Sequence, residues 1–280
     1  MKRILSIILA TVMVLGLTAC LSGCNNKSDW TAVQQKGAFV CGITLYEPMN
    51  YFDEDGNLVG FDTEFAQAVA AELGVEAKFQ VISWPNKYME LNGGFIDLIW
   101  NGFTYGNESD GVSRTEYVDF THAYLENRQC LVTKADRVDE LNAADALKGK
   151  KAVVEGGSSG EAVAVELAGG EDKITKFTSQ AAALMELSSG TADFAVIDYQ
   201  MAKAMVGTGD YTDLAINNAV QPEPEVYAIG CRKGSDLTVE INKAIEKLSA
   251  NGKLAEIAAK YGLTNDVIPN IGGAENGDEK

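Results

Sequence analysis

The residues most able to bind a small charged molecule are one arginine, one serine-rich loop and one aspartate. Arg114 offers a planar guanidinium, which can donate two parallel N–H bonds to a carboxylate. The loop Gly157-Ser158-Ser159-Gly160 precedes a predicted helix, and backbone N–H groups at a helix start bind anions. Asp198 ends a predicted buried strand and could accept hydrogen bonds from an ammonium group. Together these groups have the chemistry to bind a small molecule that carries both an anionic and a cationic group.

Each of these residues also has an ordinary structural explanation. Arg114 could pair with a nearby acid, Glu116 or Asp119. The serines of the loop could simply cap the helix that follows them, and Asp198 could cap a helix over 199–205. A nucleotide-binding P-loop is excluded, because no Gly-Lys-Ser or Gly-Lys-Thr follows the glycines.

Composition excludes several other classes of protein. The chain has 280 residues, 46% hydrophobic and 22% charged, as in ordinary globular proteins. Its 23 Lys and Arg against 40 Asp and Glu give a net charge of −17, which repels nucleic acids and anionic membranes. His122 is the only histidine, which excludes sites that need two, such as H-E-x-x-H zinc sites. We therefore expect no metal, no cofactor and no nucleic-acid partner.

The first 24 residues are typical of a bacterial lipoprotein signal. Two basic residues precede an apolar run over 4–17 that is too short to span a bilayer comfortably. Two segments of leucine, two small residues and cysteine follow, ending at Cys20 and Cys24, and each resembles a lipobox. We expect acylation at Cys24, because polar residues follow it as a tether over 25–35. Cys20 is the alternative, and a plain cleaved signal is a further one.

Three more cysteines, Cys41, Cys130 and Cys231, lie in apolar, strand-like runs. An odd number excludes a complete disulfide framework. We expect buried free thiols, with a disulfide between Cys130 and Cys231 as the alternative.

Strands and helices alternate along the chain, which predicts an α/β fold with mostly parallel strands. Apolar runs predict strands over 38–43, 77–82, 96–100, 151–154, 174–177, 193–197 and 226–231. Apolar residues at helical spacing predict helices over 62–73, 87–91, 161–167, 179–187, 236–250 and 253–260. A short internal repeat, Glu90–Asp97 against Glu186–Asp193, suggests two lobes of similar design.

Several segments, in order, resemble the polar-amino-acid-binding proteins of ABC importers, solute-binding protein family 3. The first half contributes Gly56–Asp62, Gly94–Asp97, Asn101–Thr104, Arg114, Asp119–Thr121 and Tyr124. The second half contributes Leu147–Lys151, Gly157–Ser159, Gly190–Asp193, Asp198, Asn242–Ala244, Asn251–Leu254 and Tyr261–Gly262. The order and spacing of these segments carry the resemblance, which spans about residues 36–263.

The resemblance implies a type II periplasmic-binding-protein fold, in which two α/β lobes joined by two hinge strands enclose a cleft. Lobe 1 would comprise 36–130 and 228–265. Lobe 2, with the hinge strands, would comprise 131–227. Residues 266–280 would form a flexible tail.

The resemblance also assigns residues to the two charged groups of an amino acid. The ligand carboxylate would be bound by Arg114, Ser158 and Ser159. The ligand ammonium would be bound by Asp198, by the hydroxyl of Thr104 and by the carbonyl of Gly102. Arg114 and Thr104 would come from one lobe and Ser158, Ser159 and Asp198 from the other, so that one ligand touches both lobes.

The first loop would contact the ligand's side chain through Tyr46, Glu47 and Tyr51. Core packing is the alternative for the tyrosines, and a solvated loop acid is the alternative for Glu47. The chain departs from the family pattern between Thr104 and Arg114, where about five residues are extra, and we expect these to form a loop at the cleft rim.

The implied function is capture of a free amino acid by closure about hinge strands near 129–133 and 225–229. The closed protein would deliver this ligand to the membrane permease of an ABC importer. We expect a monomer held at the outer face of the bacterial cytoplasmic membrane by its N-terminal lipid only. A polar, cystine-like ligand is suggested by Glu47, Asn50 and Asn101.

Two other functions stay open. One is an enzyme on the same fold that resembles cyclohexadienyl or arogenate dehydratase, with Glu47 or Glu155 as the acid. The other is a tethered amino-acid sensor that presents its ligand to a receptor.

Overall fold

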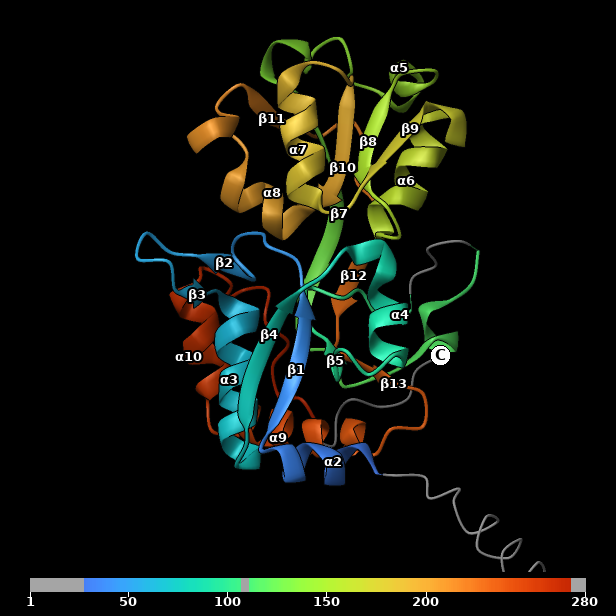
Figure 1. Cartoon of the computed structure of the whole chain (residues 1–280). Helices are drawn as coiled ribbons and strands as arrows, with labels where there is room; N and C mark the ends of the chain where they lie inside the picture. Colours follow the sequence, from blue (N-terminus) through green and yellow to red (C-terminus); the bar gives the residue numbers. More distant parts are fainter. Residues whose placement is uncertain (1–27, 107–110, 273–280) are drawn as a thin grey trace, which may run out of the picture.

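The computed structural model describes residues 28–106 and 111–272 and shows two α/β lobes, one above the other in Figure 1. The lower lobe is built on a five-stranded sheet in the order β4 (Glu76–Val81), β1 (Ala38–Ile43), β5 (Leu98–Ile99), β13 (Gly230–Arg232) and β6 (Val118–Phe120). The upper lobe is built on a sheet in the order β11 (Leu214–Asn217), β7 (Leu125–Lys134), β10 (Phe194–Asp198), β8 (Ala152–Glu155) and β9 (Ile174–Phe177). The predicted two-lobed α/β architecture is confirmed.

Helices cover both sheets. The lower lobe carries α2 (Asp29–Lys36), α3 (Phe61–Leu73), α4 (Lys87–Asn92), α9 (Leu237–Ala250) and α10 (Lys253–Lys260), with a small hairpin of β2 (Tyr51–Phe52) and β3 (Leu58–Val59). The upper lobe carries α5 (Ala144–Leu147), α6 (Ser159–Ala168), α7 (Gln180–Ser189) and α8 (Tyr199–Met205).

Local sequence explains how these helices form. In α3 the apolar residues Phe61, Phe65 and Val69 recur at helical spacing, and all three are fully buried. The helix ends at Gly74, whose φ of 71° is the left-handed conformation typical of a C-terminal cap. The predicted helix over 62–73 is therefore confirmed, with one further residue at its start.

The pairing of β8 and β10 positions two acidic side chains. Both strands run parallel, with Phe194 opposite Ala152. The carboxyl ends of parallel strands meet at one edge of a sheet, which is where ligands bind in many α/β proteins. Glu155 ends β8 and Asp198 ends β10, so the two carboxyl groups lie next to each other at the edge that faces the lower lobe.

Strand β7 runs through both lobes (Figure 1). Its first residues, Leu125–Arg128, pair with β12 (Pro224–Tyr227), and its later residues pair with β10 and β11. The single strand predicted over 226–231 is wrong, because the chain breaks into β12 and β13. At this break Ala228 donates its N–H to the carbonyl of Phe103, so the chain leaves β7 and joins the lower sheet.

Residues 29–35 do not form the predicted tether. They belong to α2, whose Val33 is fully buried and whose Asp29 pairs with Arg232 at 2.9 Å. The tether expected over 25–35 is therefore wrong from Asp29 onward, and its first residues lie outside the described part. The flexible tail expected over 266–280 is wrong as far as residue 272, since Ile268 donates its N–H to Tyr124 and Ile271 is buried.

Among the described residues, Cys41, Cys130 and Cys231 are buried free thiols, as predicted. Cys130 lies in the upper sheet and Cys231 in the lower sheet, so the alternative disulfide does not form. The signal segment over 1–24, with Cys20 and Cys24, lies outside the described residues. Within those residues, no helix has the length and apolar character needed to cross a bilayer.

The docking of α2 predicts a measurable loss of stability on Val33→Ala. The substitution removes two buried carbons and leaves a cavity, so we expect it to lower the free energy of unfolding in urea by about 2 kcal/mol. Val239→Ala is the matched control, because Val239 also lies in a helix but is 54% exposed. Equal effects of the two substitutions would contradict the docking of α2.

Candidate functional site

A small polar cavity lies where the two lobes meet. The lower lobe lines it with Trp84, Asn101, Gly102, Thr104 and Arg114, and the upper lobe with Glu155, Ser158, Ser159, Gln180 and Asp198. The cavity measures about 10 Å³, which is room for about one water molecule. The structure thus brings together all six residues predicted for the ligand's two charged groups, and a larger molecule could enter only if the lobes separate.

Arg114 is buried at the boundary between the lobes. It begins a short 3₁₀ helix over Arg114–Glu116 and is 1% exposed. Its Nη1 donates to the carbonyl of Thr104 at 3.0 Å, and its Nη2 donates across the cleft to the carbonyl of Gly157 at 3.2 Å. Asp119, an alternative partner, pairs instead with Lys233 at 2.7 Å. The guanidinium is therefore positioned for the cavity rather than for a surface salt bridge.

The serine loop places two hydroxyl groups in the cavity. Ser158 occupies the N-cap position of α6, but its side chain does not cap the helix. The Gly157 N–H is satisfied by Oε2 of Glu161 at 2.6 Å. Within the described residues, neither Ser158 Oγ nor Ser159 Oγ has a hydrogen-bond partner, and neither has Arg114 Nε. Buried polar atoms are nearly always paired, so these three indicate a site for a ligand.

Asp198 is held by amide side chains rather than by a helix cap. It sits at the N-cap position of α8 without capping it. Its Oδ1 accepts hydrogen bonds from Asn127 at 2.8 Å and from Gln129 at 2.6 Å, and its Oδ2 accepts one from Gln180. The position of the carboxylate is thus fixed from three sides.

Glu225 is a site residue that sequence reasoning did not find. It lies on β12, and its Oε1 accepts hydrogen bonds from Asn127 at 2.6 Å, Gln129 at 2.8 Å and Thr104 at 3.0 Å. Asn127 and Gln129 are two residues apart and lie on the same face of β7. Each donates to both Glu225 and Asp198 and so links the two carboxylates. Two amide side chains two residues apart, on one face of the strand, were the available signal.

Lys87 and Gln180 also went unrecognised. Lys87 begins α4, is 1% exposed, and donates to the carbonyl of Gly157 at 3.0 Å. Its Nζ lies 4.9 Å from the ring centre of Trp84. Gln180 begins α7 and binds Asp198 with both ends of its amide. Neither residue stands in a pattern that separates it from ordinary helix positions.

The first loop does not line the cavity. Glu47 is exposed, and Tyr51 is half-buried in the hairpin of β2 and β3. Tyr46 is buried beside Gly102, whose φ of 54° favours glycine and where a Cβ would lie 1.9 Å from the Tyr46 hydroxyl. Tyr46 therefore packs against the backbone at Gly102, and the aromatic residue that lines the cavity is Trp84.

Burial perturbs the acidic groups of the site. It raises the pKa of Glu155 to about 8, with a further contribution from the charge of Asp198. It raises the pKa of Glu225 to about 7, again with help from Asp198, while the amides of Gln129 and Asn127 oppose the shift. Burial likewise raises the pKa of Asp198 against the hydrogen bonds from its amide donors. The upper lobe thus presents carboxyl groups that are costly to ionise.

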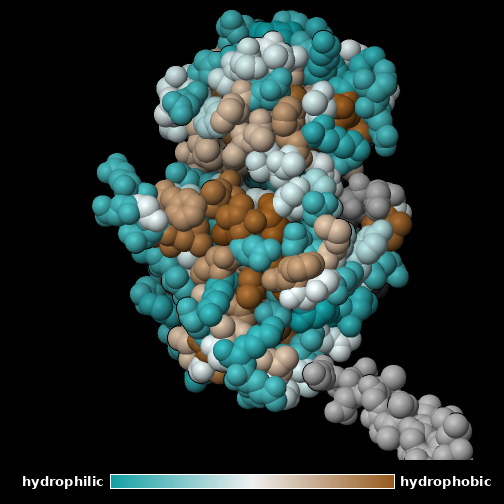
Figure 2. Space-filling model, viewed as in Figure 1, coloured by the Kyte–Doolittle hydropathy of each residue, from teal (hydrophilic) through white to brown (hydrophobic). Residues whose placement is uncertain are grey.

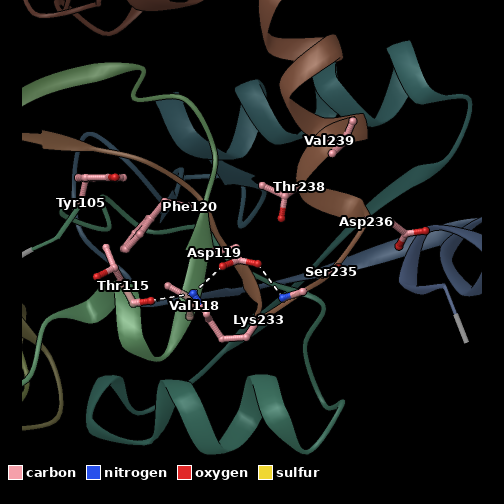
Figure 3. Close-up of a pocket in the computed structure, with 11 residues that line it drawn as sticks. Tyr105, Thr115, Val118, Asp119, Phe120, Lys233, Ser235, Asp236, Thr238 and Val239 are labelled. Carbon is pink, nitrogen blue, oxygen red and sulfur yellow. Dashed lines mark hydrogen bonds and ion pairs between the residues drawn. The ribbon is translucent and has the colours of Figure 1, made fainter. Parts of the chain in front are cut away.

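Two larger hollows have different surroundings. A groove of about 590 Å³ lies in the lower lobe beside β6 and α9, where Asp119 pairs with Lys233 and accepts the Gly234 N–H (Figure 3). Figure 2 shows apolar side chains gathered on the lower lobe along its border with the upper lobe. An apolar groove of about 510 Å³ lies between the lobes, lined by residues that include Val81 and Met185. Neither hollow contains the charged groups of the cavity.

In the part of the chain that the structure describes, no three His, Cys, Asp or Glu side chains are arranged to hold a metal ion. The carboxyl groups of Asp198 and Glu225 accept hydrogen bonds from amides and a hydroxyl instead.

The raised pKa values predict how stability depends on pH. A carboxyl group with a higher pKa in the folded than in the unfolded state favours the folded protein at low pH. Its contribution is lost as the pH rises from about 4.5 through about 8 for Glu155. We therefore expect the ligand-free protein to lose stability between about pH 5 and about pH 8.5 in denaturant titrations.

Glu155→Gln removes one of the groups responsible and should flatten this pH profile. The free energy of unfolding should differ less between about pH 5 and about pH 8.5 than it does in the wild type. We expect this difference to shrink by at least about 1.4 kcal/mol, the equivalent of one pKa unit. Glu166→Gln, on the exposed side of α6, is the control and should leave the profile unchanged. If stability depends on pH equally in the wild type and in Glu155→Gln, the raised pKa of Glu155 is contradicted.

Comparisons with known proteins identify the family of the chain. The sequence profile of the bacterial extracellular solute-binding proteins, family 3, matches residues 39–264. The L-cystine-binding protein TcyA of Bacillus subtilis is 28% identical, over 93% of this chain and 97% of its own length. The arginine-binding extracellular protein ArtP of Bacillus subtilis is 29% identical, over 93% of this chain and 98% of its own length.

Solved structures show the same fold. An ancestral arginine-binding protein bound to arginine superposes with a TM-score of 0.72 and 33% identity, covering 80% of this chain and 98% of that one. The ancestral amino-acid-binding protein AncCDT-1, a precursor of cyclohexadienyl dehydratase, gives a TM-score of 0.74 and 27% identity. The match covers 84% of this chain and 99% of that one. The chain therefore belongs to the bacterial extracellular solute-binding proteins, family 3, and has the type II periplasmic-binding-protein fold.

Proposed function

We propose that this protein captures a free amino acid between its lobes as the extracytoplasmic component of an ABC importer. One observation carries the proposal: polar atoms without partners in the described residues lie on both sides of one closed cavity. Arg114 Nε comes from the lower lobe, and the hydroxyls of Ser158 and Ser159 come from the upper lobe. Relatives of similar length bind cystine and arginine, which supports an amino acid as the ligand.

The ligand's carboxylate would be bound by Arg114 and the two serine hydroxyls. A guanidinium binds a carboxylate in a directed, two-bond arrangement, and the start of α6 adds favourable backbone dipoles. The ligand's ammonium would be bound by Asp198, with Thr104 and the carbonyl of Gly102 close by in the same cavity. One amino acid would thus bridge the lobes.

Because the proposed ligand contacts come from both lobes, ligand binding would favour closure of the lobes. In the unliganded closed form, Arg114 and Lys87 both donate to the Gly157 carbonyl. A ligand carboxylate would replace that carbonyl as the acceptor for Arg114. Only a molecule that contacts both lobes binds the closed form better than the open form, so only such a molecule shifts the equilibrium toward closure. The closed protein would then present its ligand to the permease.

The proposed location is the outer face of a bacterial cytoplasmic membrane. The first 24 residues support a lipoprotein signal, with Cys24 as the acylated residue and Cys20 as the alternative. Two acyl chains hold a protein stably at a membrane, where one does not. The protein would act there as a monomer, with the permease as its partner.

We propose a binding protein rather than an enzyme, although Glu155 gives the dehydratase alternative a physical basis. Glu155 is a buried carboxyl group in the cavity with a pKa raised to about 8, which would keep it protonated as a possible acid. The structural likeness to AncCDT-1 concerns an amino-acid-binding precursor, which favours binding.

Arg114→Lys tests the proposed carboxylate site. Lysine keeps the charge but loses the planar fork, so we expect at least about tenfold weaker binding of the best amino acid in calorimetry. The ligand is chosen by thermal shift from the standard L-amino acids and L-cystine, with protein refolded to remove carried-over ligand. Arg137→Lys, in a surface ion pair, is the control and should bind normally. If no amino acid stabilises the folded wild type, the function is wrong.

A turnover assay separates the two functions. The protein incubated with prephenate or arogenate should leave these compounds unchanged over hours, measured by absorbance of the aromatic product. Turnover that is lost on Glu155→Gln would instead establish the dehydratase.

The lipid anchor is tested with the full-length chain in its bacterial host. Cys24→Ser should release the protein from the membrane fraction, while Cys20→Ser should leave it there, because we expect only Cys24 to be acylated. Mass spectrometry of the mature N-terminus checks the acylated residue. The reverse result would assign the lipid to Cys20, and release by neither substitution would contradict the anchor.

A further inference from the structure

Glu155 is an acidic residue of the cavity, and one of its two carboxyl oxygens lacks a hydrogen-bond partner among the described residues. It ends β8, is 2% exposed and lines the cavity beside Asp198. Its Oε1 has no hydrogen-bond partner among residues 28–106 and 111–272. A buried carboxylate oxygen without a donor is rare and costly, so this atom marks the place of a donor that the protein itself does not provide.

The other two carboxylates of the site are already well supplied with donors. Asp198 accepts three side-chain hydrogen bonds, from Asn127, Gln129 and Gln180. Glu225 Oε1 accepts three, from Asn127, Gln129 and Thr104. A carboxylate has about four acceptor positions, so Asp198 retains about one for a ligand ammonium. A second nitrogen on the ligand would find its acceptor at Glu155.

The charges around the cavity are compatible with a cationic side chain on the ligand. Three acidic side chains, Glu155, Asp198 and Glu225, surround the site with two basic ones, Arg114 and Lys87. When all five are ionised, one negative charge is in excess, and a ligand with one additional positive charge compensates it. With a ligand whose side chain is neutral, Glu155 stays protonated because burial raises its pKa to about 8, and no charge is then in excess.

We propose that Glu155 recognises the side chain of the ligand and that the ligand is a basic L-amino acid, whose cationic nitrogen donates to Glu155 Oε1. This inference rests on the proposed function and narrows it from any amino acid to a cationic one. It replaces the cystine-like ligand that Glu47, Asn50 and Asn101 suggested. Glu47 is exposed and lies outside the cavity, and the Asn101 side chain is hydrogen-bonded to Thr44 and Asn50. Glu155 would therefore determine the specificity for the ligand's side chain.

The raised pKa of Glu155 is consistent with this role. Burial and the charge of Asp198 make ionisation unfavourable in the unliganded protein. A cation placed against Oε1 would favour the ionised form. The same contact would be absent with a neutral ligand, and Glu155 would then stay protonated and less able to discriminate.

The test compares two pairs of ligands that differ in charge but little in shape. L-Arginine is paired with L-citrulline, in which a neutral urea replaces the guanidinium, and L-lysine is paired with L-norleucine. Each is titrated by calorimetry into refolded wild type, Glu155→Gln and the surface control Glu166→Gln. We expect the wild type and the control to bind the cation of at least one pair more than about tenfold tighter than its neutral partner.

Glu155→Gln should reduce this ratio to less than about threefold by weakening the cation while leaving the neutral ligand unchanged or tighter. Glu155→Asp keeps the charge and should retain the preference for the cation, which separates loss of charge from loss of folding. Equal binding of both members of each pair by the wild type, tighter binding of L-cystine, or an unchanged ratio in Glu155→Gln would overturn the proposal. Failure to bind any amino acid would overturn the proposed function as well.

Discussion

Two buried carboxylates from different strands depend on the same pair of amide donors. Asn127 and Gln129 each donate to both Asp198 and Glu225, and both amides lie on β7, which runs through the two lobes. Asn127 stands opposite Glu225 in the pairing with β12, and Gln129 stands opposite Asp198 in the pairing with β10. The acidic side of the site is thus built directly on the connection between the lobes.

This arrangement couples ligand chemistry to the geometry of closure. Thr104 of the lower lobe donates to Glu225, while Arg114 and Lys87 donate to the Gly157 carbonyl of the upper lobe. Separation of the lobes would break the contacts to Gly157 and expose the cavity. In the cavity, Arg114 Nε and the hydroxyls of Ser158 and Ser159 stay unpartnered among the described residues, and a bridging ligand would satisfy them. Binding and closure are then one process.

Local chemistry and order along the chain were enough to predict much of the site. Arg114, Ser158, Ser159 and Asp198 were predicted because a guanidinium, a helix start and a strand-ending carboxylate have recognisable roles and because the segments around them resemble the family. The structure places all four in one cavity. The two lobes followed from the alternation of strands and helices. The segments most strongly marked by apolar periodicity, such as α3, were also predicted with the best boundaries.

The residues that sequence reasoning missed owe their position to long-range packing. Glu225 reaches the cavity only because β12 pairs with the first half of β7, and Lys87 only because α4 meets the loop of the other lobe. The same cause explains the errors. None of the three residues predicted from the first loop lines the cavity: Tyr46 is buried in the core, Glu47 is exposed, and Tyr51 is half-buried. Residues 29–35 fold as part of α2 because Val33 packs in the core and Asp29 pairs with Arg232, far along the chain.

The most direct test is a crystal structure of the protein with the amino acid that stabilises it most. The account predicts one ligand between the lobes, with its carboxylate within hydrogen-bond distance of Arg114 and of the hydroxyl of Ser158 or Ser159. Its ammonium should lie within the same distance of Asp198. A ligand held by one lobe alone, or bound in the groove beside β6 and α9, would contradict the account.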